Sequence, residues 1–311
     1  MKIFVTGHNG FIGAHLVNAL RSAGHDVAHS DDRIDLTNLE ILEKKFAGQD
    51  VVIHCAGFAH ADDDGSAPFA AQHWAVNYQG AVNVGEAAQR AGVKRLVFIS
   101  TSKVVADAPG QIINETFTAQ PVSVYGKAKR AAEEALLALA QNTAIEIVIL
   151  RPVMVYGRNG GGNLPRMING IRRGWFPPLP PGGARSLIHI DDLLSALLLA
   201  VTHAAAAGKI YFVSHPQPVT SQQICHAIYR TLNRPLPRWV IPGFLLYMLA
   251  IAGEIAGNIF RKPMPFNLTV YDKLMQPAVY SAEKISAELD WMPKIDLQTG
   301  IESIQQYCSG F

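Results

Sequence analysis

The chain has 311 residues, of which 49% are hydrophobic and 17% charged, and its formal net charge is +2. This composition excludes a disordered chain, and so small a charge gives no basic field for nucleic acid, so we expect no nucleic-acid partner. The length allows one large α/β domain with an appended lobe. Cys55, Cys225 and Cys308 are far apart and odd in number, which favours a reducing compartment. Met1-Lys2 runs directly into a strand, so we expect no signal peptide and a cytoplasmic location.

The first half of the sequence alternates short β-branched runs with helical segments. This alternation predicts right-handed βαβ units and an α/β fold with a doubly wound parallel sheet, the Rossmann architecture. Ligands of such sheets bind at the carboxyl ends of the strands. The expected strands cover residues 3–6, 26–30, 51–55, 96–100 and 145–150, and the expected helices cover 10–23, 74–91 and 126–140.

After Arg151-Pro152 the sequence becomes rich in glycine and proline, which predicts loops over a cleft. Asp191 and Asp192 stand where an N-cap is expected, before a helix over 193–201, and residues 209–214 are typical of a further strand. We therefore expect two domains. A dinucleotide-binding domain covers 1–155 and is rejoined by 186–214, and a smaller, mostly helical, discontinuous substrate lobe covers 156–185 and 215–311.

The most apolar stretch, residues 241–253, is too short to span a bilayer and is followed by Glu254. It predicts a helix in the core of the lobe and no transmembrane segment. The alternative is a helix that contacts a membrane surface or a lipid-linked substrate.

The glycine-rich run Gly7-His8-Asn9-Gly10-Phe11-Ile12-Gly13 follows the first strand and opens a helix. This arrangement lets the backbone approach a pyrophosphate at the positive end of the helix, although any tight turn needs glycine. The second strand ends at Asp31-Asp32-Arg33. Asp31 is the candidate for the adenosine ribose hydroxyl, whereas Arg33 suits the 2′-phosphate of NADP, and both Asp32 and Arg33 could be plain surface charges. We favour NAD, with NADP left open.

Tyr125 and Lys129 lie four residues apart at the start of a predicted helix, so both side chains project from one face. Tyr125 is the candidate acid/base. Bringing its pKa from about 10 towards neutrality requires roughly 4 kcal/mol, which a nearby ammonium and a cationic nicotinamide could supply. Thr101, at the end of the strand over 96–100, is the candidate to hydrogen-bond the reacting oxygen. Ser100 and Ser102 are candidate helpers; capping is the alternative role of these hydroxyls, and for Ser102 capping is the interpretation that we favour.

Together these motifs resemble the extended short-chain dehydrogenase/reductases, the NAD-dependent epimerase/dehydratase family. The resemblance covers nearly the whole chain. Its motifs occur in one order: GxxGxxG, Asp35-Leu36-Thr37, Asp50-Val51-Val52-Ile53-His54-Cys55-Ala56-Gly57, Val76-Asn77, Phe98-Ile99-Ser100-Thr101-Ser102, YxxxK, Leu150-Arg151-Pro152, Gly162-Asn163-Leu164 and Arg185-Ser186-Leu187-Ile188-His189-Ile190-Asp191-Asp192.

The resemblance implies roles for individual residues. Asp35 and Leu36 would contact adenine, and Lys129 would also hold the nicotinamide ribose. Ala56 and Gly57 would pass along the cofactor phosphates, and Val153 and Met154 would line the carboxamide. The remaining implied cofactor contacts are Cys55, Asn77, Ser100 and Pro152. The implied substrate contacts are His60, Ser102, Asn163 and Arg185, the last two at the sugar diphosphate. No metal site is expected, and family members imply a homodimer through the helices that carry Asn77 and Tyr125.

The sequence departs from the family in two places. Val104-Val105-Ala106 replaces the common VYG, and the arginine often found late in the sugar lobe has no clear counterpart, Lys273 being a weak substitute. Dehydratases of the family follow the hydroxyl residue with Asp-Glu, where this chain has Ser102-Lys103, so dehydration is discounted.

Two reactions remain, and the catalytic residues do not separate them. We favour C4 epimerisation of a nucleotide sugar, a UDP-hexose or UDP-N-acetylhexosamine of surface-polysaccharide synthesis. The alternative is 4-ketoreduction of a UDP-4-keto-6-deoxy-hexosamine, and some relatives act on polyprenyl-linked sugars. A minor alternative is a non-catalytic cofactor-binding protein.

Overall fold

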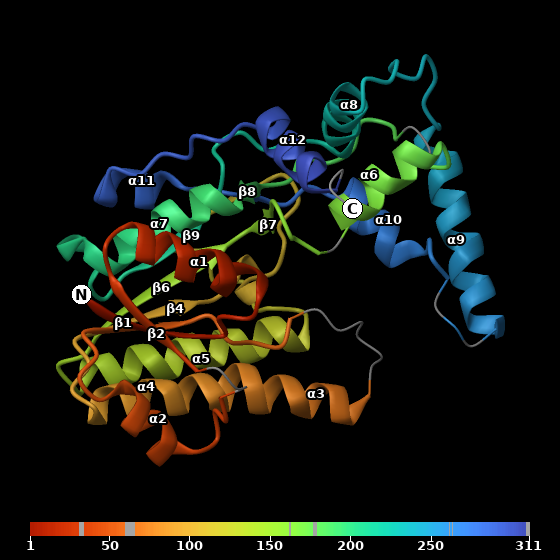
Figure 1. Cartoon of the computed structure of the whole chain (residues 1–311). Coiled ribbons are helices and arrows are strands. Elements are labelled where there is room, and N and C mark those ends of the chain that lie inside the picture. Colours follow the sequence, from red (N-terminus) through yellow and green to blue (C-terminus); the bar gives the residue numbers. More distant parts are fainter. Residues whose placement is uncertain are drawn as a thin grey trace.

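A parallel sheet organises the N-terminal two thirds of the chain in the computed structural model (Figure 1). The structure describes residues 1–30, 34–59, 66–161, 163–176, 179–260, 262 and 264–308. Within them, six strands hydrogen-bond in the order β2-β1-β3-β4-β6-β9, all parallel. Their bounds are β1 Lys2–Thr6, β2 Asp26–His29, β3 Val51–His54, β4 Arg95–Ile99, β6 Glu146–Pro152 and β9 Ile210–Val213. The order reverses between β1 and β3, so their carboxyl ends form the switch point where such sheets bind ligands.

Helices cover both faces of the sheet, as the doubly wound architecture requires (Figure 1). Side chains alternate along each strand, so Ile3 and Val5 pack on one face of the sheet and Phe4 on the other. The first face carries α1 (Phe11–Ser22), α7 (Ile190–Thr202) and α11 (Glu283–Leu289), and the second carries α2 (Leu39–Phe46), α4 (Gly80–Arg90) and α5 (Val124–Gln141). The predicted fold class is confirmed.

Two helical segments differ from the expectation. Residues 74–91, which we expected to form a whole helix, are the second part of a longer helical run whose N-cap is Ser66. The run consists of α3 (Ala67–His73), the π-helix η1 (Trp74–Gln79) and α4. The second difference is α2, which we did not expect. The predicted N-cap of α7 is wrong, because His189 caps this helix and the two aspartates lie in its first turn. Asp192 instead accepts the N–H groups of Lys294 and Ile295, and so ties a later segment to the helix.

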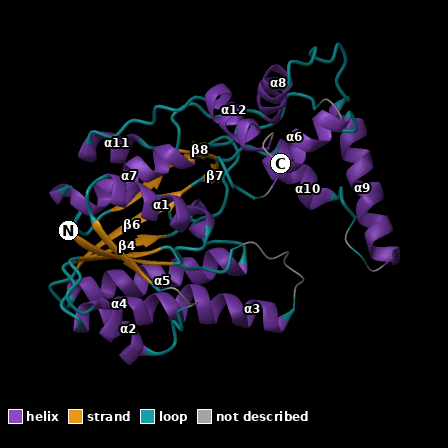
Figure 2. Ribbon diagram, viewed as in Figure 1, coloured by secondary structure: helices purple, strands orange, loops and turns teal. Residues whose placement is uncertain are grey.

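The rest of the chain is mostly helical (Figure 2). Its helices are α6 (Asn163–Arg173), α8 (Ser221–Thr231), α9 (Gly243–Phe260), α10 (Leu268–Met275) and α12 (Leu297–Cys308), and all of them contribute side chains to a third apolar cluster. The remaining strands form two short pairs: β7 (Met154–Tyr156) with β8 (Leu187–His189), and β5 (Ile112–Ile113) with β10 (Val279–Tyr280). There are also two 3₁₀ turns, η2 (Ser102–Val104) and η3 (Ala204–Ala206). The division into two domains stays a prediction, and α11, grouped there with the lobe, packs on the sheet.

The apolar stretch near residue 241 does not form the core helix that we expected. The helix α9 continues past Glu254 to Phe260, and only Leu246 and Ala250 on it are buried. A short apolar run is compatible with burial or exposure, because the sequence does not show which segments cover it. Among the described helices, α9 alone has the length and apolar composition of a membrane span.

A buried ion pair joins α5 to β6 beneath the end of the sheet. Arg151 donates from Nε and Nη2 to the carboxylate of Glu133 at 3.0 and 2.6 Å. The two side chains are only 4% and 1% exposed. Because α5 also carries Tyr125 and Lys129, this pair fixes the position of both residues relative to the strand ends.

We expect Glu133→Ala to lower the free energy of unfolding by about 3–5 kcal/mol, because it leaves the Arg151 guanidinium buried without its counter-charge. The matched control is Glu134→Ala on the same helix, whose carboxylate pairs with Arg130 at the surface and should cost less than about 1 kcal/mol. Urea denaturation of both variants measures the difference. Equal losses would contradict the assigned importance of the pair.

Candidate cofactor and catalytic site

The turn between β1 and α1 brings two backbone segments into close contact. Gly7 has φ of 73°, and a Cβ on it would lie 2.5 Å from the backbone nitrogen of Ala56. A Cβ on Gly13 would clash with the carbonyl of Gly7. Gly10 is the N-cap residue of α1 and has no side chain to cap the helix, and the first turn of α1 contains no acidic residue. Its first N–H groups and positive dipole end are therefore available to an anion.

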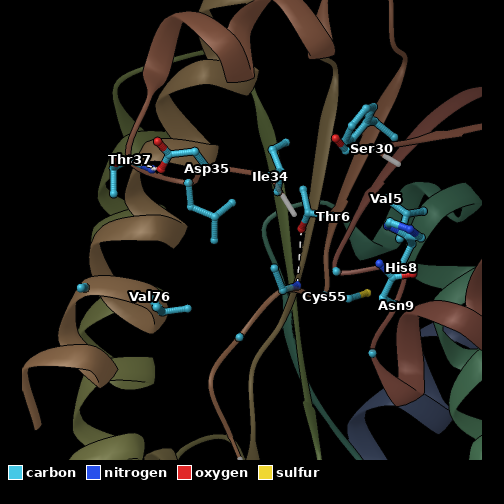
Figure 3. A pocket seen from close by; sticks show the side chains of 17 residues that line it. Val5, Thr6, His8, Asn9, Ser30, Ile34, Asp35, Thr37, Cys55 and Val76 are labelled. Carbon is cyan, nitrogen blue, oxygen red and sulfur yellow. Dashed lines mark hydrogen bonds between the residues drawn. The ribbon is translucent and has the colours of Figure 1, made fainter. Parts of the chain in front are cut away.

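A cavity of about 680 Å³ lies at the carboxyl ends of β1 and β3 (Figure 3). Asp35 and Thr37 stand at one end of it and His8 and Asn9 at the other (Figure 3). The carboxylate of Asp35 accepts hydrogen bonds from the backbone N–H and hydroxyl of Thr37 at 2.9 and 2.7 Å, and these bonds lower the pKa of Asp35. The predicted cofactor residues that line this cavity are Gly7, Asn9, Gly10, Asp35, Leu36, Cys55, Ala56 and Gly57.

A second cavity of about 460 Å³ continues from the first, since Gly10, Cys55 and Gly57 line both. Ten further predicted residues line the second cavity: Phe11, Ile12, Gly13, Ser100, Thr101, Tyr125, Lys129, Pro152, Val153 and Met154. An elongated cleft with an uncapped helix N-terminus midway along it fits a dinucleotide, whose pyrophosphate would lie at α1.

Tyr125, Thr101 and Lys129 come together at the inner end of the cleft. Ser123 caps α5 by accepting the N–H of Gly126 at 3.1 Å, which places Tyr125 in the first turn of the helix. The hydroxyl of Thr101 lies near the phenol of Tyr125 and lowers the pKa of Tyr125. Lys129 donates its ammonium to the carbonyl of Ile99 at 2.9 Å. The arrangement places a phenol, an alcohol and an ammonium beside one another, which suits proton transfer to or from a sugar hydroxyl.

Burial dominates the ionisation of the catalytic candidates. It raises the pKa of Tyr125 to about 12, and the nearby hydroxyl of Thr101 opposes that rise. Burial also lowers the pKa of Lys129 to about 8, against the opposing effects of Cys55 and Glu133. We expected Lys129 to bring the pKa of Tyr125 down towards neutrality, but with the protein's own groups alone this pKa is raised. Further positive charge near the phenol is needed.

Asn77 lies behind the cleft and not in its wall. It is fully buried, and its amide accepts the N–H of Phe58 and donates to the carbonyl of the same residue, both at 2.9 Å. The π-helical turn that carries Asn77 directs it there, a use of such turns that is common near functional sites. Asn77 thus holds the loop that contains Gly57, and a Cβ on Gly57 would lie only 3.1 Å from the Asn77 amide oxygen.

The predicted substrate residues are less well placed. Ser102 is buried near Tyr280, while Thr101 caps the turn η2, a role that we had assigned to Ser102. Arg185 donates to the carbonyls of Lys273 and Gln276 at 3.1 and 3.0 Å. The side chain of Asn163 and all of Asp31, Asp32, Arg33 and His60 lie outside the described residues.

Several cleft residues were not predicted. Thr37 and Val76 belong to motifs quoted for the resemblance, so the sequence contained a signal for them. Tyr156 and Leu164 line the second cavity, and their burial follows from the packing of β7 and α6, which the sequence does not specify. Among the described residues, no group of three or more His, Cys, Asp or Glu side chains is arranged to hold a metal ion.

Comparisons with known proteins agree with this site. The family model described as NAD dependent epimerase/dehydratase family matches residues 3–214. A UDP-glucose 4-epimerase of Vibrio cholerae is 28% identical over 98% of this chain and 94% of its own length. A 2-alkyl-3-oxoalkanoate reductase of Stenotrophomonas maltophilia is 27% identical over 98% of both chains. The fold matches a UDP-glucuronic acid 4-epimerase of Bacillus cereus in complex with NAD, with a TM-score of 0.77, 21% identity and coverage of 100% and 99%.

The chain belongs to the NAD-dependent epimerase/dehydratase family. It is an NAD(P)-dependent enzyme of the extended short-chain dehydrogenase/reductases, and the predicted family and cofactor class are confirmed.

The buried ammonium of Lys129 predicts a pH dependence of stability. Its pKa of about 8 in the folded chain lies below the value of about 10.4 for unfolded lysine, so between these values the unfolded state binds more protons and stability rises with pH. We expect the free energy of unfolding of the wild type, minus that of Lys129→Met, to increase by at most about 1.4 kcal/mol per pH unit across this window. Urea denaturation at stepped pH measures it, and a constant difference would contradict the burial effect.

Proposed function

We propose that the enzyme interconverts the C4 epimers of a nucleotide-activated sugar, a UDP-hexose or UDP-N-acetylhexosamine. The observation that carries the proposal is that Thr101, Tyr125 and Lys129 line one cavity, which continues from the cofactor cleft. The Vibrio cholerae relative named a UDP-glucose 4-epimerase, which this chain matches over nearly its full length, supports the same reaction.

The residues of the cleft have distinct tasks in this reaction. Tyr125 takes the proton of the C4 hydroxyl and later returns it, while Thr101 orients the same sugar oxygen. NAD bound in the cleft would supply the acceptor and donor for the C4 hydride, and its oxidised ring would add the positive charge that Tyr125 requires. Lys129 holds the nicotinamide ribose. Because the cofactor ends in its starting state, no net oxidation is expected.

The residues that follow Thr101 support epimerisation over dehydration. Dehydratases of the family place an acid and a base there, whereas here Ser102 is buried against Tyr280. Lys103 forms an ion pair with Asp107 at 2.7 Å and is thereby engaged at the surface. Neither Ser102 nor Lys103 has the carboxyl group that would serve as acid or base in the loss of water.

The test separates the epimerase from the 4-ketoreductase. The purified enzyme is denatured, the released nicotinamide is identified by mass spectrometry, and UDP-glucose and UDP-N-acetylglucosamine are followed by proton NMR. We expect retained NAD and a mixture of C4 epimers without change in absorbance at the NADH band. An enzyme free of cofactor that consumes NADPH or NADH with a UDP-4-keto-6-deoxy-hexosamine, and forms no epimer, would overturn the proposal.

We expect Tyr125→Phe to lower turnover roughly a hundred- to ten-thousand-fold, because it removes the group that transfers the proton. NAD binding, measured by calorimetry, should change little. The matched control is Tyr211→Phe, which removes a tyrosine hydroxyl that donates to Glu288 away from the cleft. Unchanged turnover in Tyr125→Phe, or an equal loss in the control, would contradict the assignment.

The cellular setting of this reaction belongs to the same proposal. We place the enzyme in the cytoplasm, in the synthesis of a surface polysaccharide, as a homodimer that pairs through η1, α4 and α5. These helices lie side by side on one face of the sheet (Figure 1), which supports such a pairing.

A further inference from the structure

The helix α9 exposes apolar side chains around most of its circumference. Phe244, Met248 and Ile259 are 69%, 57% and 70% exposed, and Glu254 is the one charged residue among its eighteen. The exposed surface continues into the preceding loop, where Trp239 is 65% exposed. A helix that is apolar all round is ordinarily enclosed by protein or lipid, so this surface requires an occupant.

We propose that α9 and the loop before it dock this enzyme onto the surface of an anionic lipid bilayer, with the helix lying in the plane of the interface. The proposal is independent of the reaction catalysed in the cleft. It concerns a surface at the edge of the lobe farthest from the sheet (Figure 1).

The charges around α9 are complementary to anionic lipid. Residues 163–185, which include α6, and residues 215–253, which end within α9, contain no Asp or Glu. Arg234 donates to the carbonyls of Ile171 and Arg172 at 2.9 and 2.6 Å, so its guanidinium lies at the C-terminal end of α6. Arg172 and Arg173 lie in the last turn of α6, and Arg234 and Arg238 lie on the chain that leads into α9. Arg234 thus brings the basic residues of the two segments together. A basic flank beside aromatic and aliphatic side chains is typical of helices that bind anionic interfaces.

The fold does not permit α9 to cross a bilayer. The chain after α9 turns back along it, since Phe266 occupies the place of a Cβ on Gly253 and the rings of Tyr247 and Tyr271 lie 5.3 Å apart. Helix α8 precedes α9 in the chain and helix α12 follows it, and these two helices pack in one cluster. A single crossing would place these two helices on opposite sides of the membrane. The helix must therefore lie along the surface, where such helices insert about 5–10 Å.

A second copy of the chain fits this surface less well. In a symmetric pair both copies present the same patch, so the pairing would bring two basic flanks into one interface. Lipid headgroups would neutralise the same charges. The attachment of α9 to the cleft adds a consequence: Leu246 packs in the same cluster as Leu164, which lines the second cavity, so docking would hold the cleft close to the bilayer.

The experiment is flotation of the full-length enzyme with vesicles of phosphatidylcholine alone or mixed with phosphatidylglycerol. We expect binding to the mixed vesicles that weakens with salt, and little binding to the neutral ones. The triple variant F244Q/M248Q/I259Q should bind roughly tenfold more weakly, because it removes three inserted side chains. The matched control is I41Q/V122Q, two exposed apolar positions on other elements, which should bind as the wild type does.

Three outcomes would overturn the proposal. The wild type could fail to float with either vesicle, or the control variant could lose binding to the same degree as the triple variant. In the third outcome the wild type binds no vesicle but forms an oligomer in light scattering, and the triple variant is a monomer. That result would assign the surface to a second copy of the chain. Circular dichroism and NAD binding of each variant verify that the fold is retained.

Discussion

The close approach of two backbone turns governs the whole site. The turn after β1 and the loop after β3 meet at the switch point of the sheet, where Gly7 leaves no room for a side chain against Ala56. Beside this contact Gly10 provides no side-chain cap for α1, so the cleft acquires its anion-binding centre there. The loop after β3 is held in turn by the buried amide of Asn77, and it lies beside the ammonium of Lys129. One steric constraint thus connects the phosphate end of the cleft to its catalytic end.

The electrostatics of the cleft divide the work between protein and cofactor. Burial keeps Tyr125 protonated and weakens the hold of Lys129 on its proton, so the protein alone does not create a reactive phenolate. The ion pair of Arg151 with Glu133 anchors α5 but leaves Lys129 bonded to the carbonyl of Ile99. A positive charge brought by the oxidised cofactor would act in a dry pocket, where it has its largest effect. In this account the acid/base becomes competent only when the cofactor is in place.

The sequence predicted the sheet and the cleft better than the lobe. Buried parallel strands and glycine turns leave local patterns, which predicted the fold class and the glycine turn, and the family resemblance supplied many of the other cavity residues. The role of Asn77 depends on a π-helical turn, and Asp192 in the first turn of α7 binds a segment a hundred residues away; no local pattern encodes either contact. The helix α9 was placed in the core because its composition resembles that of a core helix. Only the packing of the lobe shows that most of the helix surface stays exposed.

The most direct test of the central claim follows one hydrogen. UDP-glucose carrying deuterium at C4 is incubated with the enzyme in the presence of excess unlabelled NADH, and the positions of the label are read by NMR and mass spectrometry. If the cleft removes the C4 hydride and returns it to the opposite face, both epimers will retain deuterium at C4 and none will enter the NADH pool. Epimers that carry protium at C4, label found in the NADH pool, or no epimer formed at all would contradict the account.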